Sequence, residues 1–268
     1  SRSSAASDVY KRQVLLLFLS SGIWVAISMI GVSSIGMILF TSRPVGDAMA
    51  TTIWGASSSW TLTALPLFVW MGEILFRTKL SENLFEGLAP WLQKLPGGLI
   101  HVNVVGCALF AAISGSSAAT VATVGKMSIP ELRKRKYPEK ILLGSLAGSG
   151  TLGLLIPPSI ILIIYGVTVQ ESIAKLFIAG IIPGIMIALI FMGYVIIWSL
   201  LNKNKMPLTE ENYSFLNKLS KSKQLIPVIL LILGVIGSIY TGIATATEAA
   251  SLGAVSYTHL RAHETSLH

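Results

Sequence analysis

The stretch GSLAGSGTLGLLIPPSIILIIYG (144–166), with AAISGSSAATVATVG (111–125) ahead of it, decides the fold of this chain. Both are apolar segments interrupted by Gly, Ser or Pro, and each interruption frees backbone N–H and C=O groups. Hydrocarbon cannot satisfy such groups, so a membrane protein tolerates them only where they are buried in protein or line a wet cavity. In transporters that cavity is usually the substrate and ion site.

The composition places the chain in a membrane. Of its 268 residues, 53% are hydrophobic and 12% are charged, whereas a soluble domain carries roughly 25% charged residues. The net charge of +8 does not indicate nucleic-acid binding, because the basic residues fall in the gaps between apolar runs, as the positive-inside rule predicts. We therefore predict an all-α polytopic membrane protein in which the one cysteine, Cys107, is a small buried hydrophobe.

The two ends of the chain differ from the rest. Residues 1–13 and 256–268 are polar and resemble translated sequencing-adaptor sequence. We predict that both are artefactual tails and exclude them from the fold. Residues 14–255 then form the predicted transmembrane domain.

Several continuous apolar runs are predicted membrane spans. They are Val14–Phe40, Leu62–Phe76, Leu176–Leu201 and Leu225–Tyr240. The segment Arg77–Leu95 instead alternates charged and apolar residues at helical spacing, which predicts an amphipathic helix along the membrane surface. Ala48–Trp60 is rich in small residues and is expected to form a short helix.

The length of the interrupted segments limits how often each can cross the membrane. Two full spans need roughly 40 residues plus a turn, which is more than Leu99–Pro130 provides. We predict a re-entrant hairpin with Ser114–Ser117 at its tip. Ile141–Gly166 is predicted to be a discontinuous helix, broken at 148–153 and again at 156–159.

The charges of the loops give an orientation. The loops 131–140 and 202–223 are both basic, and two crossings separate them, so they are expected on the same side of the membrane. The positive-inside rule makes that side cytoplasmic. The predicted hairpin then opens from the cytoplasmic face.

The hairpin tip is the first candidate site, with Ser114, Gly115, Ser116 and Ser117. Hydroxyl and freed carbonyl oxygens suit a hard cation such as Na⁺, so Ser114 and Ser116 are candidate ligands. Half-helix N-termini aimed at the same place attract a carboxylate. Two alternatives stay open. One is a small-residue helix contact in a scaffold subunit; the other is an intramembrane hydrolase with a serine nucleophile and His101 as base.

The helix break is the second candidate site, with Gly153, Ile156, Pro157, Pro158 and Ser159. The two prolines remove two N–H donors, so the preceding carbonyls lose their usual helical partners. A double proline beside Gly-rich sequence in a membrane favours a discontinuity around a site over a structural kink.

The third and weaker candidate is the pair Thr245 and Thr247. Thr245 and Glu248 have the spacing of a capping box, which predicts a helix start at this point. Glu248 is also the only carboxylate of the last apolar stretch, and a carboxylate at membrane depth is a functional candidate by default.

Four long motifs now point to one family. They are FAAISGSSAAT (110–120), LGLLIPPSIILIIYGV (152–167), ESIAKLFIAGIIPGI (171–185) and TGIATATEAASLGA (241–254). In this order they resemble the large membrane subunit of TRAP transporters, the tripartite ATP-independent periplasmic transporters. The resemblance covers most of 45–255.

The resemblance implies an elevator-type fold like that of the ion-transporter superfamily, with inverted repeats that each carry a re-entrant hairpin. It implies Na⁺-driven uptake of an organic anion, usually a carboxylate, across the bacterial inner membrane, with no organic cofactor and no enzymatic reaction. The implied partners are a periplasmic substrate-binding protein and a smaller membrane subunit.

The chain departs from the family pattern in two places. Members usually read Thr-Pro-Thr-Glu where this chain has Thr245-Ala246-Thr247-Glu248, so the backbone break there is expected to be softer. Members are also longer, and the second repeat is absent. Residues 14–255 are therefore expected to be a partial transporter domain that holds half of the site, because the site lies between repeats.

Overall fold

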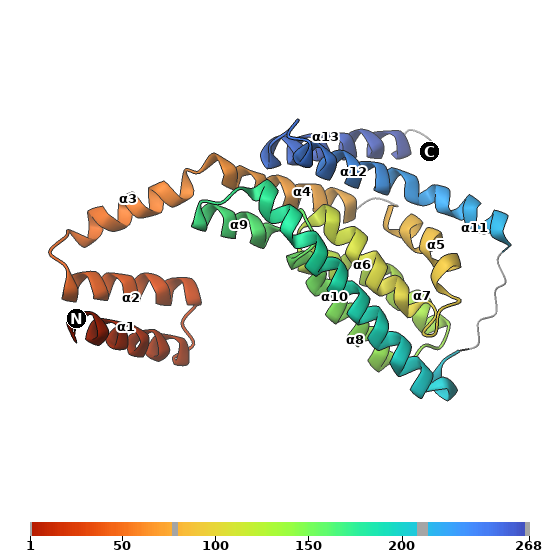
Figure 1. Ribbon diagram of the computed structural model, residues 1–268, viewed down its shortest axis with the longest axis horizontal. Helices are drawn as coiled ribbons and strands as arrows, with labels where there is room; N and C mark the ends of the chain where they lie inside the picture. Colours follow the sequence, from red (N-terminus) through yellow and green to blue (C-terminus); the bar gives the residue numbers. More distant parts are fainter. Residues whose placement is uncertain (1, 77–79, 208–213, 266–268) are drawn as a thin grey trace. The chain divides into compact units, whose positions relative to one another are not determined.

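A computed structural model describes residues 2–76, 80–207 and 214–265. Within these residues every regular element is an α-helix or a short 3₁₀ helix, which confirms the all-α prediction (Figure 1). The chain divides into two compact units, with the division between Ser59 and Trp60. Each unit is described by itself.

The first unit contains α1 (Arg2–Ser20), α2 (Val25–Phe40) and α3 (Val45–Ser57). The predicted single span Val14–Phe40 is wrong, because the chain turns between α1 and α2. Gly22 has φ +79°, a left-handed conformation that ends the helix. The two helices then pack against each other, and a side chain at Gly31 would meet the Phe18 ring at 2.6 Å.

The second unit holds the remaining helices. The α-helices are α4 (Ala64–Phe76), α5 (Leu80–Leu92), α6 (Ile100–Ser114), α7 (Ser117–Lys134), α8 (Glu139–Gly150), α9 (Ile160–Val169), α10 (Ile173–Leu201), α11 (Phe215–Ser222), α12 (Ile226–Tyr240) and α13 (Ala246–Thr265). The 3₁₀ helices are η1 (Trp60–Thr63), η2 (Thr151–Leu154), η3 (Lys203–Lys205) and η4 (Lys223–Leu225).

Helix α6 forms the centre of the second unit. Nearly all of its 15 residues are buried, since α4, α5, α7, α8 and α10 pack around it. Cys107 on this helix is fully buried, as expected for a small hydrophobe. A helix covered on all sides by protein has little contact with lipid, which suits the inner arm of a hairpin.

Two segments among the described residues are long and apolar enough to cross a membrane, namely Ile173–Leu201 and Phe215–Tyr240. They contain the predicted spans Leu176–Leu201 and Leu225–Tyr240. The predicted span at Leu62–Phe76 is shorter than expected. Its helix α4 has 13 residues and reaches about 20 Å at 1.5 Å per residue, less than the ~30 Å hydrocarbon core.

Helix α5 is amphipathic, as the Arg77–Leu95 pattern predicts, and its apolar face packs on protein. Leu84, Phe85 and Leu88 are buried in the protein core, where α5 packs against α6, α7, α11 and η4. Residues 77–79 lie outside the described residues. The sequence pattern cannot tell protein from lipid, because both offer an apolar partner.

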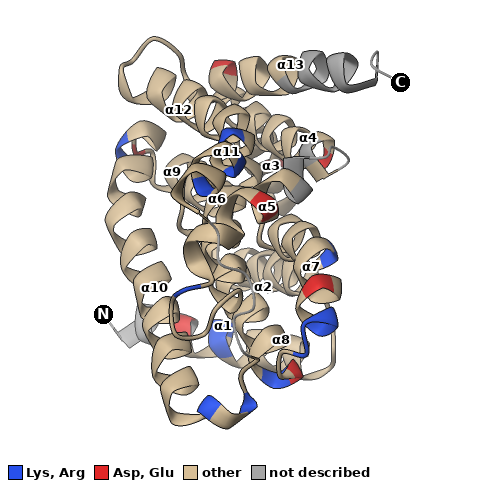
Figure 2. Cartoon of the chain, turned by 90° about the vertical axis from the view of Figure 1, so that its right-hand side faces the viewer, with Lys and Arg blue, Asp and Glu red and all other residues tan. Residues whose placement is uncertain are grey.

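Basic residues gather at one end of the second unit, where α7 leads into α8 and α10 ends (Figure 2). A buried cluster at this end contacts Tyr137 from the first connection, Trp198 near the end of α10 and Met206 from the second connection. The loop 131–140 and the start of the loop 202–223 thus lie together, while 208–213 are outside the described residues. Their cytoplasmic location stays a prediction.

The same end holds the base of the hairpin formed by α6 and α7. The Tyr137 hydroxyl accepts a hydrogen bond from the Leu99 N–H at 3.1 Å. Gly98, with φ +55°, leaves room for this hydroxyl, which a side chain there would strike. Tyr137 therefore ties the loop after α7 to the chain just before α6.

Candidate functional site

The hairpin tip is a short turn between α6 and α7. Gly115 follows the last residue of α6 with φ +60°, a conformation that glycine adopts without steric cost. Ser116 is extended and caps α7, and its hydroxyl accepts a hydrogen bond from the Ala119 N–H at 3.4 Å. The predicted turn at 114–117 is confirmed, while its re-entrant path in a membrane stays a prediction.

The second interruption separates α8 and η2 from α9. Pro157 and Pro158 have no N–H to donate to the Gly153 and Leu154 carbonyls, one turn earlier. The Ser159 hydroxyl replaces one of these donors, at 2.7 Å from the Leu154 oxygen. Ser159 is also the N-cap residue of α9.

The two interruptions meet in space. The Ile160 N–H donates to the Gly115 carbonyl at 3.3 Å. A Cβ atom at Gly115 would lie 2.7 Å from the Pro158 oxygen, and one at Gly153 would lie 3.0 Å from the Ser117 nitrogen. The sequence gives two separate candidate sites, and the structure joins them into one, hereafter the junction (114–117 and 153–160).

Helix ends converge at the junction. α6 and η2 end here, while α7 and α9 begin here with Ser116 and Ser159 as their caps. The N-terminus of a helix carries a partial positive charge and free N–H groups. Two such ends side by side can attract an anion, and the neighbouring carbonyls can bind a cation.

The hydroxyl groups of the junction differ in how they are satisfied. The Ser114 and Thr120 hydroxyl oxygens are 3.0 Å apart, and the Thr120 hydroxyl donates to the Ser116 carbonyl at 2.8 Å. The Ser117 hydroxyl is buried and has no hydrogen-bond partner among the described residues. Since buried polar groups rarely stay unpaired, this oxygen is the hydroxyl of the junction that is best placed to bind a ligand.

Neighbouring helices approach the junction at glycines. A Cβ atom at Gly72 of α4 would lie 2.9 Å from the Ser114 Cβ. On α10, Gly180 faces the Leu155 carbonyl and Gly184 faces the Ile156 side chain, at 2.7 and 2.8 Å from their ideal Cβ positions. α4 and α10 therefore contact the junction through glycines, where no side chain keeps the helices apart.

Thr245 and Thr247 lie elsewhere, at the start of α13. The Glu248 carboxylate accepts hydrogen bonds from the Thr245 N–H and hydroxyl, both at 2.8 Å, and the Glu248 N–H donates to the Thr245 hydroxyl at 3.3 Å. The predicted capping box is confirmed. α13 packs on α4 and α12 (Figure 1), so α4 connects it to the junction, with Met71 against Gly253 and Gly72 against Ser114.

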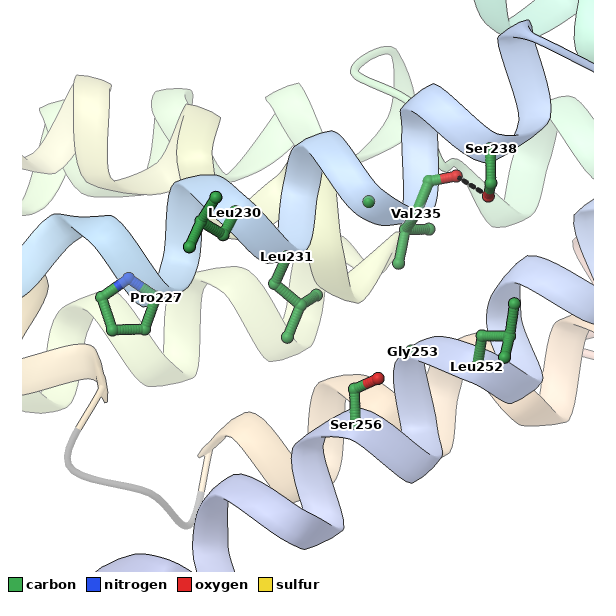
Figure 3. Close-up of a pocket in the computed structure, with 9 residues that line it drawn as sticks. Pro227, Leu230, Leu231, Val235, Ser238, Leu252, Gly253 and Ser256 are labelled. Carbon is green, nitrogen blue, oxygen red and sulfur yellow. Dashed lines mark hydrogen bonds between the residues drawn. The ribbon is translucent and has the colours of Figure 1, made fainter. Parts of the chain in front are cut away.

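A separate groove of about 440 Å³ runs between α12 and α13 (Figure 3). Its walls are mostly aliphatic, and the Ser238 hydroxyl in it already donates to the Val235 carbonyl at 2.8 Å. Among the described residues, no charged side chain lines it. It therefore offers no group to bind an organic anion, and the junction remains the stronger candidate.

Comparison with known proteins decides the family. The family described as "Tripartite ATP-independent periplasmic transporter, DctM component" matches residues 13–263. This chain belongs to that family. The matched region begins at the end of the first predicted tail and continues into the second.

Curated relatives carry the same family name. The chain is 36% identical, over 84% of its length, to the C4-dicarboxylate TRAP transporter large permease protein DctM of Pseudomonas aeruginosa, and covers 52% of that protein. It is 34% identical, over 90% of its length, to the sialic acid TRAP transporter large permease protein SiaM of Vibrio cholerae, and covers 55% of it. The chain thus spans about half the length of these relatives.

The names of the TRAP relatives differ in substrate. Besides C4-dicarboxylate and sialic acid, they include ectoine and 5-hydroxyectoine for a large permease of Ruegeria pomeroyi that is 32% identical over 92% of this chain. Family membership therefore places the chain among inner-membrane transporter permeases without naming what it carries.

The hydrolase alternative fails on geometry. A general base must lie within about 3 Å of the serine hydroxyl. His101 stands near the start of α6, about 20 Å along the helix from Ser114 at 1.5 Å per residue. Its ring nitrogen Nε2 lies 2.8 Å from the Pro96 carbonyl oxygen instead.

Sequence reasoning missed Thr120 and Gly72. Thr120 stands four residues after the cap Ser116, at the spacing at which a threonine can reach the cap's carbonyl, so its role had a local signal. Gly72 contacts Ser114 from a helix far away in sequence, and no local pattern marks such a contact.

Proposed function

We propose that the junction is one half of a Na⁺ and substrate site in a TRAP large permease subunit, which takes up an organic anion, typically a carboxylate. The observation that carries the proposal is the hydrogen bond from the Ile160 N–H to the Gly115 carbonyl, which joins the two interruptions. In the same turn the Ser117 hydroxyl has no hydrogen-bond partner among the described residues. The whole permease includes the length that this chain lacks.

The donor set fits Na⁺. A hard cation prefers oxygen ligands, and the junction supplies hydroxyl and carbonyl oxygens with no carboxylate among its residues. Ser114 and Ser116 would hold the ion, with the Ser117 hydroxyl as a third oxygen and the Gly153 carbonyl nearby. When bound, Na⁺ supplies a positive charge that favours binding of an anion next to it.

The anion would bind at the start of α7 and α9. Free N–H groups and the positive ends of both helices favour a carboxylate there. Thr245 and Thr247 remain weaker candidates for contact with substrate, because their observed hydrogen bonds are local to α13.

Transport would follow an elevator mechanism. In this proposal α6 and α7 form a re-entrant hairpin that opens from the cytoplasmic face, with the loops 131–140 and 202–223 in the cytoplasm. Residues of the junction bind ion and anion together, and the hairpin-bearing part then moves across the bilayer. A small membrane subunit and a periplasmic substrate-binding protein would complete the system.

The test is uptake by the full-length parent permease with both partners in proteoliposomes. Candidate radiolabelled carboxylates are screened first with a Na⁺ gradient. We expect uptake of at least one substrate to stop when K⁺ replaces Na⁺ at equal ionic strength. Uptake at the same rate in K⁺ would overturn Na⁺ coupling, since no other ion would then be required.

A further inference from the structure

A second hollow lies outside the junction, between α8 and α10, with a volume of about 540 Å³. α8 contributes a floor with two glycines, Gly144 and Gly148, and α10 contributes a wall with Phe191 and Tyr194. A Cβ atom at Gly144 would meet nothing within 4 Å. The space above Gly144 is therefore open, and glycine is what keeps it open.

The two ends of this groove differ in polarity. Lys140 and Trp198 line one end, and Gly148 and Phe191 line the other. The distance from Lys140 to Gly148 is about 12 Å along α8. The lysine end is also the basic end of the second unit (Figure 2), so the groove runs from charged surface into apolar surroundings.

Lys140 is available to a ligand. Arg133 is paired with Glu139, and Arg135 lies 2.8 Å from Glu131. Lys140 makes no ion pair among the described residues, although it stands among these charges. An ammonium group at the mouth of an apolar groove can reach outward while its stem lies on apolar surface.

We propose that this groove binds an anionic phospholipid, with one acyl chain over Gly144 and the headgroup phosphate at Lys140. α10 is long and apolar enough to cross a membrane, so the groove lies along a membrane helix. A lipid in one leaflet has the same order of polarity, from charged headgroup to apolar chain. Trp198 and Tyr194 are of the type that gathers at the membrane interface.

A helix from another membrane protein is the main rival occupant. Glycines four residues apart commonly let two helix backbones approach closely. Here, however, the Phe191 ring already lies 3.5 Å from the ideal Cβ position of Gly148. Only Gly144 remains open, which leaves room for a chain but not for a second backbone at both glycines.

The experiment is native mass spectrometry of the purified chain in detergent, with added phosphatidylglycerol or zwitterionic phosphatidylethanolamine. We expect phosphatidylglycerol to bind more tightly. Gly144→Leu fills the groove and should weaken binding of both lipids by roughly tenfold. Gly193→Leu is its matched control, because Gly193 also has nothing within 4 Å of its Cβ position and does not line the groove.

A second variant tests the headgroup. Lys140→Gln should weaken phosphatidylglycerol binding about fivefold, since one basic residue near an anionic surface contributes about 1 kcal/mol. It should weaken phosphatidylethanolamine binding less, because the ammonium group of that headgroup offsets its phosphate. Lys134→Gln, which removes a nearby charge outside the groove, should have a smaller effect.

Three results would overturn the proposal. The first is a Gly144→Leu variant that binds lipid as tightly as the original chain. The second is a Lys140→Gln variant that keeps the preference for phosphatidylglycerol. The third is a Gly144→Leu variant that loses only its association with the small membrane subunit, which would assign the groove to a partner helix. Since none of these readouts involves Na⁺ or uptake, their failure is distinct from failure of the proposed transport site.

Discussion

The junction and the start of α13 are both interruptions in apolar sequence, but their polar groups are satisfied in different ways. At α13 the capping box of Thr245 and Glu248 satisfies the helix end from within one turn. At the junction the Gly115 carbonyl accepts a hydrogen bond from Ile160, in another segment, and the Ser117 hydroxyl has no partner within the described part of the chain. An interruption alone therefore does not single out a candidate site, whereas the convergence of two interruptions does.

The largest expected effect comes from substitution of two glycines that both have positive φ. Gly115→Ala should lower the free energy of unfolding by about 2 to 5 kcal/mol, because left-handed backbone costs about 1–2 kcal/mol and overpacking against Pro158 adds about 1–3 kcal/mol. Gly242→Ala, with φ +74° and no atom within 4 Å, should cost only the backbone part. Thermal melting of both variants measures the difference. Equal melting temperatures would show that the junction is not closely packed.

The next largest effect is expected at the capping box of α13. Thr245→Ala should lower stability by about 1 kcal/mol, the usual cost of an N-cap, and Thr245→Ser should restore most of it. Denaturant unfolding of the three proteins gives the values. A loss that serine does not restore would mean that the threonine methyl group, rather than the cap, is responsible.

A smaller effect is expected inside the junction. The Ser114 and Thr120 hydroxyls are 3.0 Å apart, so Ser114→Ala and Thr120→Val should be coupled by roughly 0.5–1.5 kcal/mol, the net worth of a hydrogen bond. A double-mutant cycle on stability measures this coupling. Strictly additive changes in stability would show that the two hydroxyls do not interact. They would contradict the chain of hydrogen bonds from Ser114 through Thr120 to the Ser116 carbonyl.

The smallest effect on stability is expected at Ser117. Its buried hydroxyl has no partner among the described residues, so Ser117→Ala removes an unsatisfied group and should leave the unfolding midpoint unchanged or slightly raised. A clear loss of stability would reveal a structural partner for this hydroxyl. It would weaken the contrast between the unsatisfied junction and the self-satisfied start of α13.

Sequence predicted the interruptions well because their causes are local. Gly115, the Pro157–Pro158 pair and the Thr245–Glu248 spacing each act within a few residues, so their positions are visible in one dimension. The turn at Gly22 was missed, since a glycine within an apolar run is common in membrane helices. Its effect depends on the packing of α1 against α2.

The rest depends on contacts between distant segments. That Ile160 bonds Gly115, or that Gly72 admits Ser114, follows from how the helices are arranged and not from a local pattern. The partner of the α5 apolar face was also assigned wrongly, because Leu84 and Leu88 would bury equally well in lipid or in protein. Convergence of the two breaks became visible only with the structure.

Na⁺ dependence of the Ser117→Ala variant tests the central claim most directly. In proteoliposomes of the full-length permease with its partners, the Na⁺ concentration for half-maximal uptake should rise at least several-fold, since one oxygen ligand is lost. Ser238→Ala, which removes a hydroxyl between α12 and α13, is the control and should behave like the unmodified protein. An unchanged Na⁺ dependence in Ser117→Ala would contradict an ion site at the junction.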